Sequence, residues 1–139
     1  LARIRKRSDG VMGDAVKFYN GSFCEAGNFG KETAIVKNAW HSRVAYSEAY
    51  KKFMMVSSSV NGRPELNYVS DYMEIRFSDD LISWGEPHTI KQGEKTFGAH
   101  YNAAISYRGT GDTFVITGNE FTALTCNNGS DVTATDIKF

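Results

Sequence analysis

The sequence predicts an all-β fold, and three observations support this prediction. Short segments with alternating polarity or many β-branched and aromatic residues recur at a spacing of roughly ten residues. Thirteen glycines lie at turn-like places between these segments, whereas the chain has only two prolines. No stretch of about a dozen residues keeps its apolar positions at the 3.6-residue period of a helix. The length of 139 residues favours a single domain with one core.

The predicted strands share this polarity pattern and are separated by turn residues. They cover residues 15–19, 33–37, 42–46, 52–57, 73–77, 88–91, 102–107, 113–117 and 132–139. Asn-Gly pairs at 20–21, 61–62 and 128–129 and the glycine-rich segment 108–112 mark the turns, because tight hairpins require residues that adopt positive φ. Strands at this spacing indicate a sandwich, a barrel or a propeller.

Composition excludes several functional classes. Sixteen basic and sixteen acidic residues cancel, so the chain has no net charge with which to attract nucleic acid or an anionic membrane. No apolar run approaches the ~20 residues that span a bilayer, which predicts a soluble protein. The basic start at 1–7 is too short for a targeting segment. Cys24 and Cys126 either pair in an oxidising compartment or remain two free thiols.

Internal repetition favours the propeller among the three architectures. Segments 43–46 and 51–56 form one predicted hairpin, and 103–107 and 113–117 form a second with the same layout. A third strand of alternating polarity follows each hairpin. Apolar inner strands followed by a more exposed outer strand are what a radially stacked blade needs. We therefore predict a partial β-propeller of two to three antiparallel four-stranded blades.

The most specific motif is Ser-x-Asp-Leu-x-x-Trp, from Ser78 to Trp84. In such a turn the Asp80 carboxylate can accept hydrogen bonds from neighbouring backbone amides, and Trp84 can fold back over the hairpin. This turn resembles that of the five-bladed β-propellers of family 43 glycoside hydrolases and their relatives. It is also similar to the Asp-box turn of sialidases but one residue shorter, so the sialidase spacing is not met.

Nearly the whole chain takes part in the resemblance. It resembles the C-terminal half of such a propeller. The resemblance implies that 1–37 is the remainder of an earlier blade, 38–95 a blade and 96–139 the final blade of a single domain. A complete propeller of this kind requires roughly 250–300 residues, and half of one leaves its side faces open. We therefore expect a fragment of a longer protein that lacks its N-terminal half, or a homo-oligomer such as a homodimer, secreted or periplasmic in location.

Ligand sites of propellers lie where the inner strands begin, and two segments are predicted there. The candidate sugar-binding residues are Trp40, His41, Arg43, His100, Tyr101 and Asn102. His41 and Arg43 alternate with Ser42, so both can face one side of the strand. The alternative for His41 is a structural hydrogen bond between strands, and for Arg43 a surface ion pair. The loop 59–72, rich in polar residues and tyrosine, is the second candidate for a contact surface.

Glycoside hydrolysis requires two carboxylates across the scissile bond. The candidates are Asp14, Glu25, Asp71 and Glu120, with Glu120 expected in a polar turn after a strand. None matches a catalytic acid of the family, so the catalytic residues are unknown. Three scattered histidines predict no metal site, and no cofactor is expected.

The predicted function is therefore that of a glycoside hydrolase-like, carbohydrate-binding fragment. It supplies walls of a sugar-binding pocket without a complete catalytic set, and is expected to be inactive as this chain alone. The alternative is a non-enzymatic binding or assembly module that pairs through open propeller faces. A structural β-domain without a ligand is the third possibility.

Overall fold

The computed structural model describes residues 1–59, 72–96, 100–105, 116–127 and 131–138. Every regular element in these ranges is a β-strand, so the all-β prediction is confirmed. The described part of the chain contains no helix that could cross a membrane. The chain divides into two compact units, Leu1–Lys37 and Asn38–Phe139, and each is considered by itself.

The first unit is a three-stranded antiparallel sheet of β1 (Ala2–Lys6), β2 (Met12–Tyr19) and β3 (Ser22–Ala26). Asn20 and Gly21 join β2 to β3 with φ angles of 46° and 87°, as a two-residue hairpin turn requires. Phe18 is buried and meets the ring of Phe23 edge-on, with centroids 5.3 Å apart. This Asn-Gly turn is therefore confirmed.

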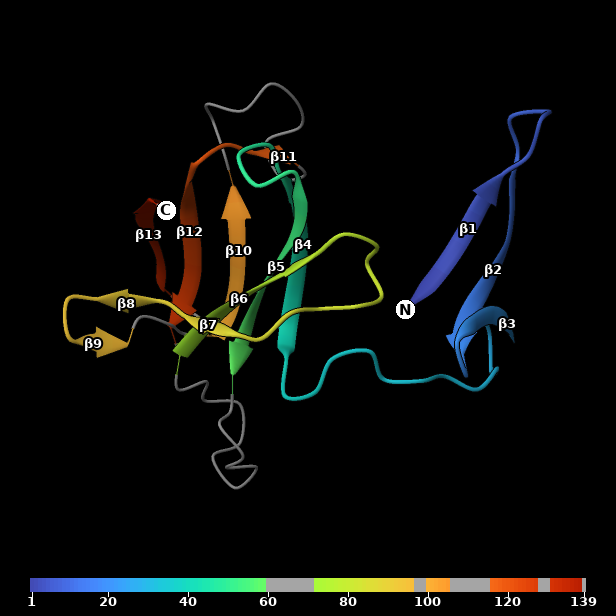
Figure 1. Cartoon of the computed structure of the whole chain (residues 1–139), viewed down its shortest axis with the longest axis horizontal. Coiled ribbons are helices and arrows are strands. Elements are labelled where there is room, and N and C mark those ends of the chain that lie inside the picture. The colour runs from blue at the N-terminus through green and yellow to red at the C-terminus, as the bar shows by residue number, and fades with distance from the viewer. Residues whose placement is uncertain (60–71, 97–99, 106–115, 128–130, 139) are drawn as a thin grey trace. The chain divides into compact units, whose positions relative to one another are not determined.

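The second unit contains a five-stranded sheet that curls into a half-barrel (Figure 1). Its strand order is β11 (Ile116–Thr117), β4 (Trp40–Ser47), β5 (Lys52–Ser59), β6 (Tyr72–Ser78) and β7 (His88–Thr89). Strands β4 to β7 form an antiparallel meander, whereas β11 joins the far side of β4 in parallel.

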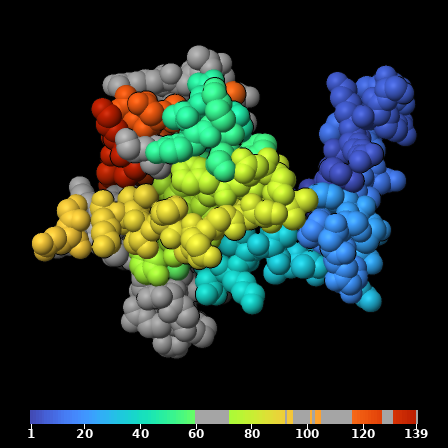
Figure 2. All heavy atoms as spheres, viewed as in Figure 1, coloured from blue at the N-terminus to red at the C-terminus, as the bar shows by residue number. Residues whose placement is uncertain are grey.

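A second sheet of this unit has three antiparallel strands. They are β10 (His100–Ile105), β12 (Glu120–Asn127) and β13 (Asp131–Lys138). Strand β10 lies beside β4 and runs in the same direction (Figure 1). A separate ribbon of β8 (Lys91–Gln92) and β9 (Lys95–Thr96) projects from the surface of the unit, as the gold segment of Figure 2 shows.

The core of the second unit forms between its two sheets. The five-stranded sheet contributes Ala45, Met54, Val56, Met73 and Ile75, and the three-stranded sheet contributes Ala104, Phe121 and Ala123. Met54 and Val56 alternate with residues of the other sheet face because successive side chains of a strand point to opposite sides. That other face is also buried in part, and beside Met55 it carries the polar residues Ser57, Glu74 and Arg76.

Two predicted strands and one predicted hairpin differ from the structure. Residues 33–37 form no strand, because the only backbone bond they add to the first sheet runs from the Thr33 amide to Phe18. Segment 88–91 is divided between β7 and β8. The predicted hairpin of 103–107 with 113–117 is wrong in its described part, since β10 pairs with β12 and Ile116–Thr117 pairs with β4.

Four strands were missing from the prediction: β1, β3, β9 and β12. Glu120 begins β12 opposite Lys138, so its expected place in a polar turn was wrong. The turns at 61–62, 108–112 and 128–129 lie outside the described residues. The meander of β4 to β7 agrees with the strand order predicted for one blade, whereas the division of the whole chain into blades stays a prediction.

Candidate functional site

The starts of β4 and β10 share one irregularity of the backbone. On β4 the pairing advances from Trp40 to Arg43 while its partner advances only from Ser58 to Val56, so β4 carries one extra residue there. On β10 the pairing advances from His100 to Ala103 while β12 advances only from Cys126 to Leu124. Each strand therefore begins with a β-bulge, a feature that re-aims side chains next to binding sites.

The second residue of each bulge has a left-handed backbone. The φ angle is 49° at His41 and 54° at Tyr101. Glycine usually occupies such positions, because a side chain costs about 1–3 kcal/mol there. Two bulky residues in equivalent strained positions mark this region as a candidate site, since strain of this kind concentrates where ligands bind.

The two bulges bring their aromatic rings together. The ring centroids of His41 and Tyr101 are 4.2 Å apart, with an angle of 45° between the planes. The Trp40 indole meets His41 edge-on, with centroids 6.1 Å apart. Trp40 is 37% exposed and Tyr101 is 54% exposed, while His41 is half-buried between them. Trp40, His41 and Tyr101 therefore form a partly open group of rings, here called the aromatic platform.

The bulge changes which side chains of β4 share a face. Trp40 pairs with Ser58 and Arg43 pairs with Val56, and these two partners point to the same side of β5. Trp40 and Arg43 therefore lie on one face of the sheet, although an unbroken strand would place them on opposite faces. The strict alternation used to align His41 with Arg43 does not hold across the bulge. Arg43 itself is exposed, and its Nη1 donates to the Ser42 carbonyl oxygen at 3.2 Å.

Three of the six predicted sugar-binding residues thus meet in the aromatic platform, and Arg43 lies on the same strand. For His100 and Asn102 the structure describes only the backbone, on β10 beside Tyr101. The second predicted contact surface, the loop 59–72, lies almost wholly outside the described residues. No sequence pattern predicted the bulges, although histidine tolerates left-handed angles better than most residues do.

The candidate acids are divided between the two units. Exposed Asp14 lies on β2, and Glu25 lies on β3, where its carboxylate accepts a hydrogen bond from the Lys31 amide at 3.2 Å. Glu120 belongs to the second unit, and Asp71 lies outside the described residues. Cys24 on β3 and Cys126 on β12 are both free thiols.

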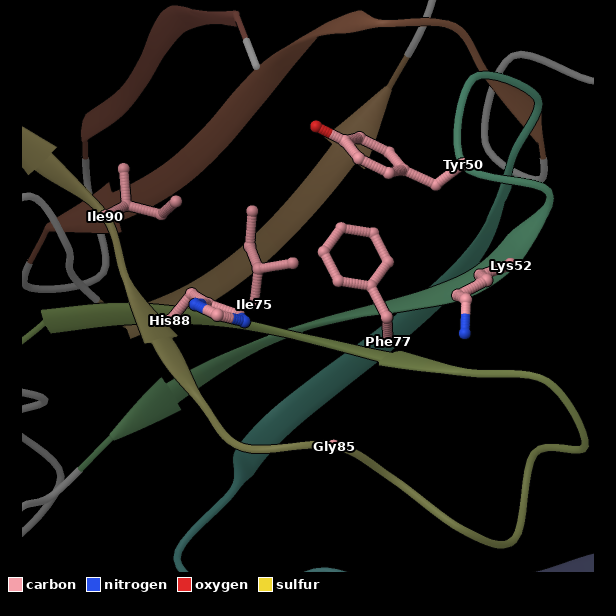
Figure 3. A pocket seen from close by; sticks show the side chains of 7 residues that line it. All are labelled: Tyr50, Lys52, Ile75, Phe77, Gly85, His88 and Ile90. Carbon is pink, nitrogen blue, oxygen red and sulfur yellow. The ribbon is translucent and has the colours of Figure 1, made fainter.

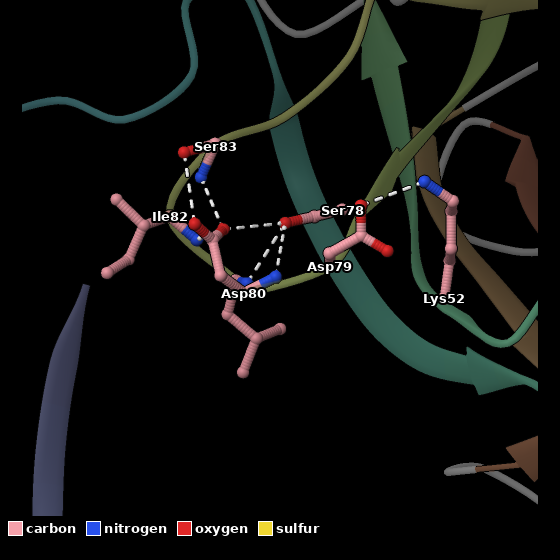
Figure 4. Close-up of polar contacts among 7 residues, drawn as sticks. Lys52, Ser78, Asp79, Asp80, Ile82 and Ser83 are labelled. Carbon is pink, nitrogen blue, oxygen red and sulfur yellow. Dashed lines mark hydrogen bonds and ion pairs between the residues drawn. The ribbon is translucent and has the colours of Figure 1, made fainter.

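The turn from Ser78 to Trp84 has the hydrogen bonds that its sequence predicts (Figure 4). The Asp80 carboxylate accepts the backbone amides of Ile82 and Ser83 at 2.8 and 2.7 Å. The Ser78 hydroxyl oxygen accepts the Leu81 amide at 2.9 Å. The Trp84 indole folds back within the turn, where its Nε1 donates to the Leu81 carbonyl at 3.2 Å. The predicted role of Asp80 is therefore confirmed, whereas the predicted packing of Trp84 over the hairpin stays a prediction.

These bonds also set the ionisation of Asp80. The amides of Ser83 and Ile82 stabilise the carboxylate and lower its pKa from 3.8 to about 2. Since the donors come from the same short turn, the charge of Asp80 serves local structure. The neighbouring Asp79 instead pairs with Lys52 of β5 at 2.9 Å.

Comparison of the chain with protein-family models, with curated proteins and with solved structures gives no match. A functional assignment therefore depends on the geometry of the chain itself.

Proposed function

We propose that this chain is the sugar-binding part of a carbohydrate-active β-propeller of the family 43-like glycoside hydrolase type. The observation that supports this proposal is the pair of equivalent bulges. They set His41 and Tyr101 in ring contact at the start of two neighbouring strands that run in the same direction. In a propeller, the inner strands of adjacent blades begin beside one another at the ligand pocket.

The aromatic platform suits the chemistry of a sugar. The C–H faces of a sugar ring are apolar and pack against aromatic rings, while its hydroxyls need a few placed polar groups. Trp40 and Tyr101 offer exposed ring surface, and the imidazole of His41 lies between them. Arg43 provides an exposed guanidinium that can pair with the carboxylate of an acidic sugar. Oligosaccharides with or without uronic acids are therefore the proposed ligands.

By itself the chain would bind without hydrolysing. The family's acid and base have no matching positions here, so under this proposal the chain does not supply the catalytic set. Glycosidase assays on the chain alone are expected to give no turnover, and turnover abolished by a single change at one of the four candidate acids would contradict this part of the proposal.

Tryptophan fluorescence can test the binding site. The chain has two tryptophans, so a Trp84→Phe variant leaves Trp40 as the only indole emitter. Titration with xylan- and arabinan-derived oligosaccharides, with and without uronic acid groups, should then change the Trp40 emission in a saturable way. Loss of one stacking residue typically costs about 2 kcal/mol, so Tyr101→Ala should weaken binding at least tenfold.

Tyr50→Ala is the matched control. Tyr50 is similarly exposed, at 46%, and also packs against another ring, that of Phe77 at 5.0 Å, but it belongs to the link between β4 and β5. This variant should keep the wild-type affinity for sugar. Equal weakening by both variants, or no saturable signal with any sugar, would contradict the proposed site.

One observation favours the alternative of an assembly module. Strand β13 has eight residues and lies at the edge of its sheet in the described part of the chain, with Val132 68% exposed. An edge of this length can pair with a second copy. Light scattering should then show a dimer that Val132→Lys disrupts, whereas the sugar-binding reading predicts that this variant leaves the Trp40 titration unchanged.

A further inference from the structure

The larger unit contains a hollow whose lining includes none of the residues of the aromatic platform. Its volume is about 600 Å³, within the range of small-molecule sites. It is lined by Tyr50, Lys52, Ile75, Phe77, Gly85, His88 and Ile90 (Figure 3).

The floor of this hollow is apolar. Ile75 is 1% exposed and belongs to the core, and half-buried Phe77 and Ile90 pack against that core. The rings of Tyr50 and Phe77 are 5.0 Å apart, tilted by 44°. In Figure 3 the Tyr50 ring stands over the hollow on the same side as Phe77, Ile75 and Ile90. A further aromatic ring could join the Tyr50–Phe77 pair in the tilted or edge-on contacts that such rings favour.

The rim of the hollow carries cationic and hydrogen-bonding groups. Lys52 and exposed His88 both line it. The Lys52 ammonium is paired with Asp79 at 2.9 Å, but the two side chains are 43% and 74% exposed. An ion pair this exposed contributes at most about 1 kcal/mol, so an anion that brings its own apolar contacts can displace Asp79.

We propose that this hollow binds a small aromatic carboxylate. The aromatic body would lie on Ile75, Phe77 and Ile90 beside Tyr50, and the carboxylate would exchange with Asp79 as the partner of Lys52. This site shares no lining residue with the aromatic platform, so failure of one proposal leaves the other unaffected.

Two fluorescent probes with the same rings test this assignment. Anilinonaphthalene sulfonate has a fixed negative charge, and N-phenyl-1-naphthylamine has the same ring system without it. The folded chain should bind the charged probe at least fivefold more tightly, and 2-naphthoate should displace it while 2-naphthamide does so at least fivefold less well. Equal affinity for the two probes, or no binding of either, would overturn the proposal.

Variants of the ion pair should act in opposite directions. Lys52→Met keeps the apolar stem, and should weaken the charged probe about five- to tenfold without changing the neutral one. Asp79→Asn removes the competing carboxylate and should tighten the charged probe about twofold. Both variants break the same ion pair. If both changed the affinity for the charged probe equally and in the same direction, the pair would matter only to the structure, and the proposal would be overturned.

Two further variants separate the site from nonspecific binding. Tyr50→Ala should weaken both probes, whereas Lys91→Gln, at an exposed lysine outside the hollow, should weaken neither. Unchanged near-UV circular dichroism in each variant ensures that the probes do not report a loosened core. If Lys91→Gln weakened the charged probe as much as Lys52→Met does, the binding would be due to surface charge, and the proposal would be overturned.

Discussion

The imidazole of His41 and the phenol of Tyr101 pack with centroids 4.2 Å apart, and both residues have left-handed backbone angles. In the described part of the chain their strands belong to different sheets, so the two rings meet by packing between the sheets. The chain therefore bears the cost of two strained positions at one place on its surface. Four predictions follow from this and from other local features.

Glycine should be better tolerated than alanine at position 101. Alanine keeps the left-handed penalty that Tyr101 bears, whereas glycine removes it, so Tyr101→Gly should be about 1 kcal/mol more stable than Tyr101→Ala. Urea denaturation measures this difference. Tyr46, on the same sheet as His41 and with an ordinary backbone, is the control, and there alanine should be the more stable. If alanine were more stable than glycine at both positions, the backbone of Tyr101 would not be strained.

The Asp80 turn should make stability depend on pH in the acidic range. The pKa of this carboxyl falls from 3.8 to about 2 in the folded chain, so its stabilising effect is complete above the higher value and disappears as the pH falls toward the lower one. Asp80→Asn should therefore be less stable than wild type at neutral pH, and the two should converge near the lower value. Urea midpoints across this range test it, and a constant difference between the proteins would contradict it.

The core between the two sheets should be sensitive to lost volume. Met54 is fully buried, so Met54→Ala should lower the free energy of unfolding by about 2–5 kcal/mol. Met54→Leu nearly conserves volume and should cost less than about 1.5 kcal/mol. Chemical denaturation followed by near-UV circular dichroism compares the two, and similar losses would show that the site collapses around the smaller side chain.

The polar face of β6 contains a buried ion pair. Glu74 Oε2 lies 2.9 Å from Arg76 Nη2 without the geometry of a hydrogen bond, and Arg76 Nη1 donates to the Ser57 hydroxyl at 3.3 Å. Removing one charge leaves the other buried, so Glu74→Leu or Arg76→Met should each cost about 3–5 kcal/mol, and the double variant should cost less than either single one. A double-mutant cycle measures this coupling, and additive effects would contradict it.

Local features were readable from the sequence because neighbouring residues decide them. The Asn20-Gly21 hairpin and the Ser78-to-Trp84 turn formed as predicted, since their donors, acceptors and positive φ angles lie within a few residues of one another. Strand β12 was missed, although buried Phe121 and Ala123 alternate along it and could have indicated it. Trp40, His41 and Tyr101 were also named from the sequence, and their rings do lie close together, but their role in sugar binding stays a prediction.

What the sequence determined by itself is an all-β chain, the turns at 20–21 and 78–84 and most of its strands, because each depends on local polarity and backbone preference. Only the tertiary structure decided that β11 joins β4, that β10 pairs with β12, and that two bulges bring His41 against Tyr101. Pairing between distant segments is chosen by the combined burial of both sheets, and no local period carries that information.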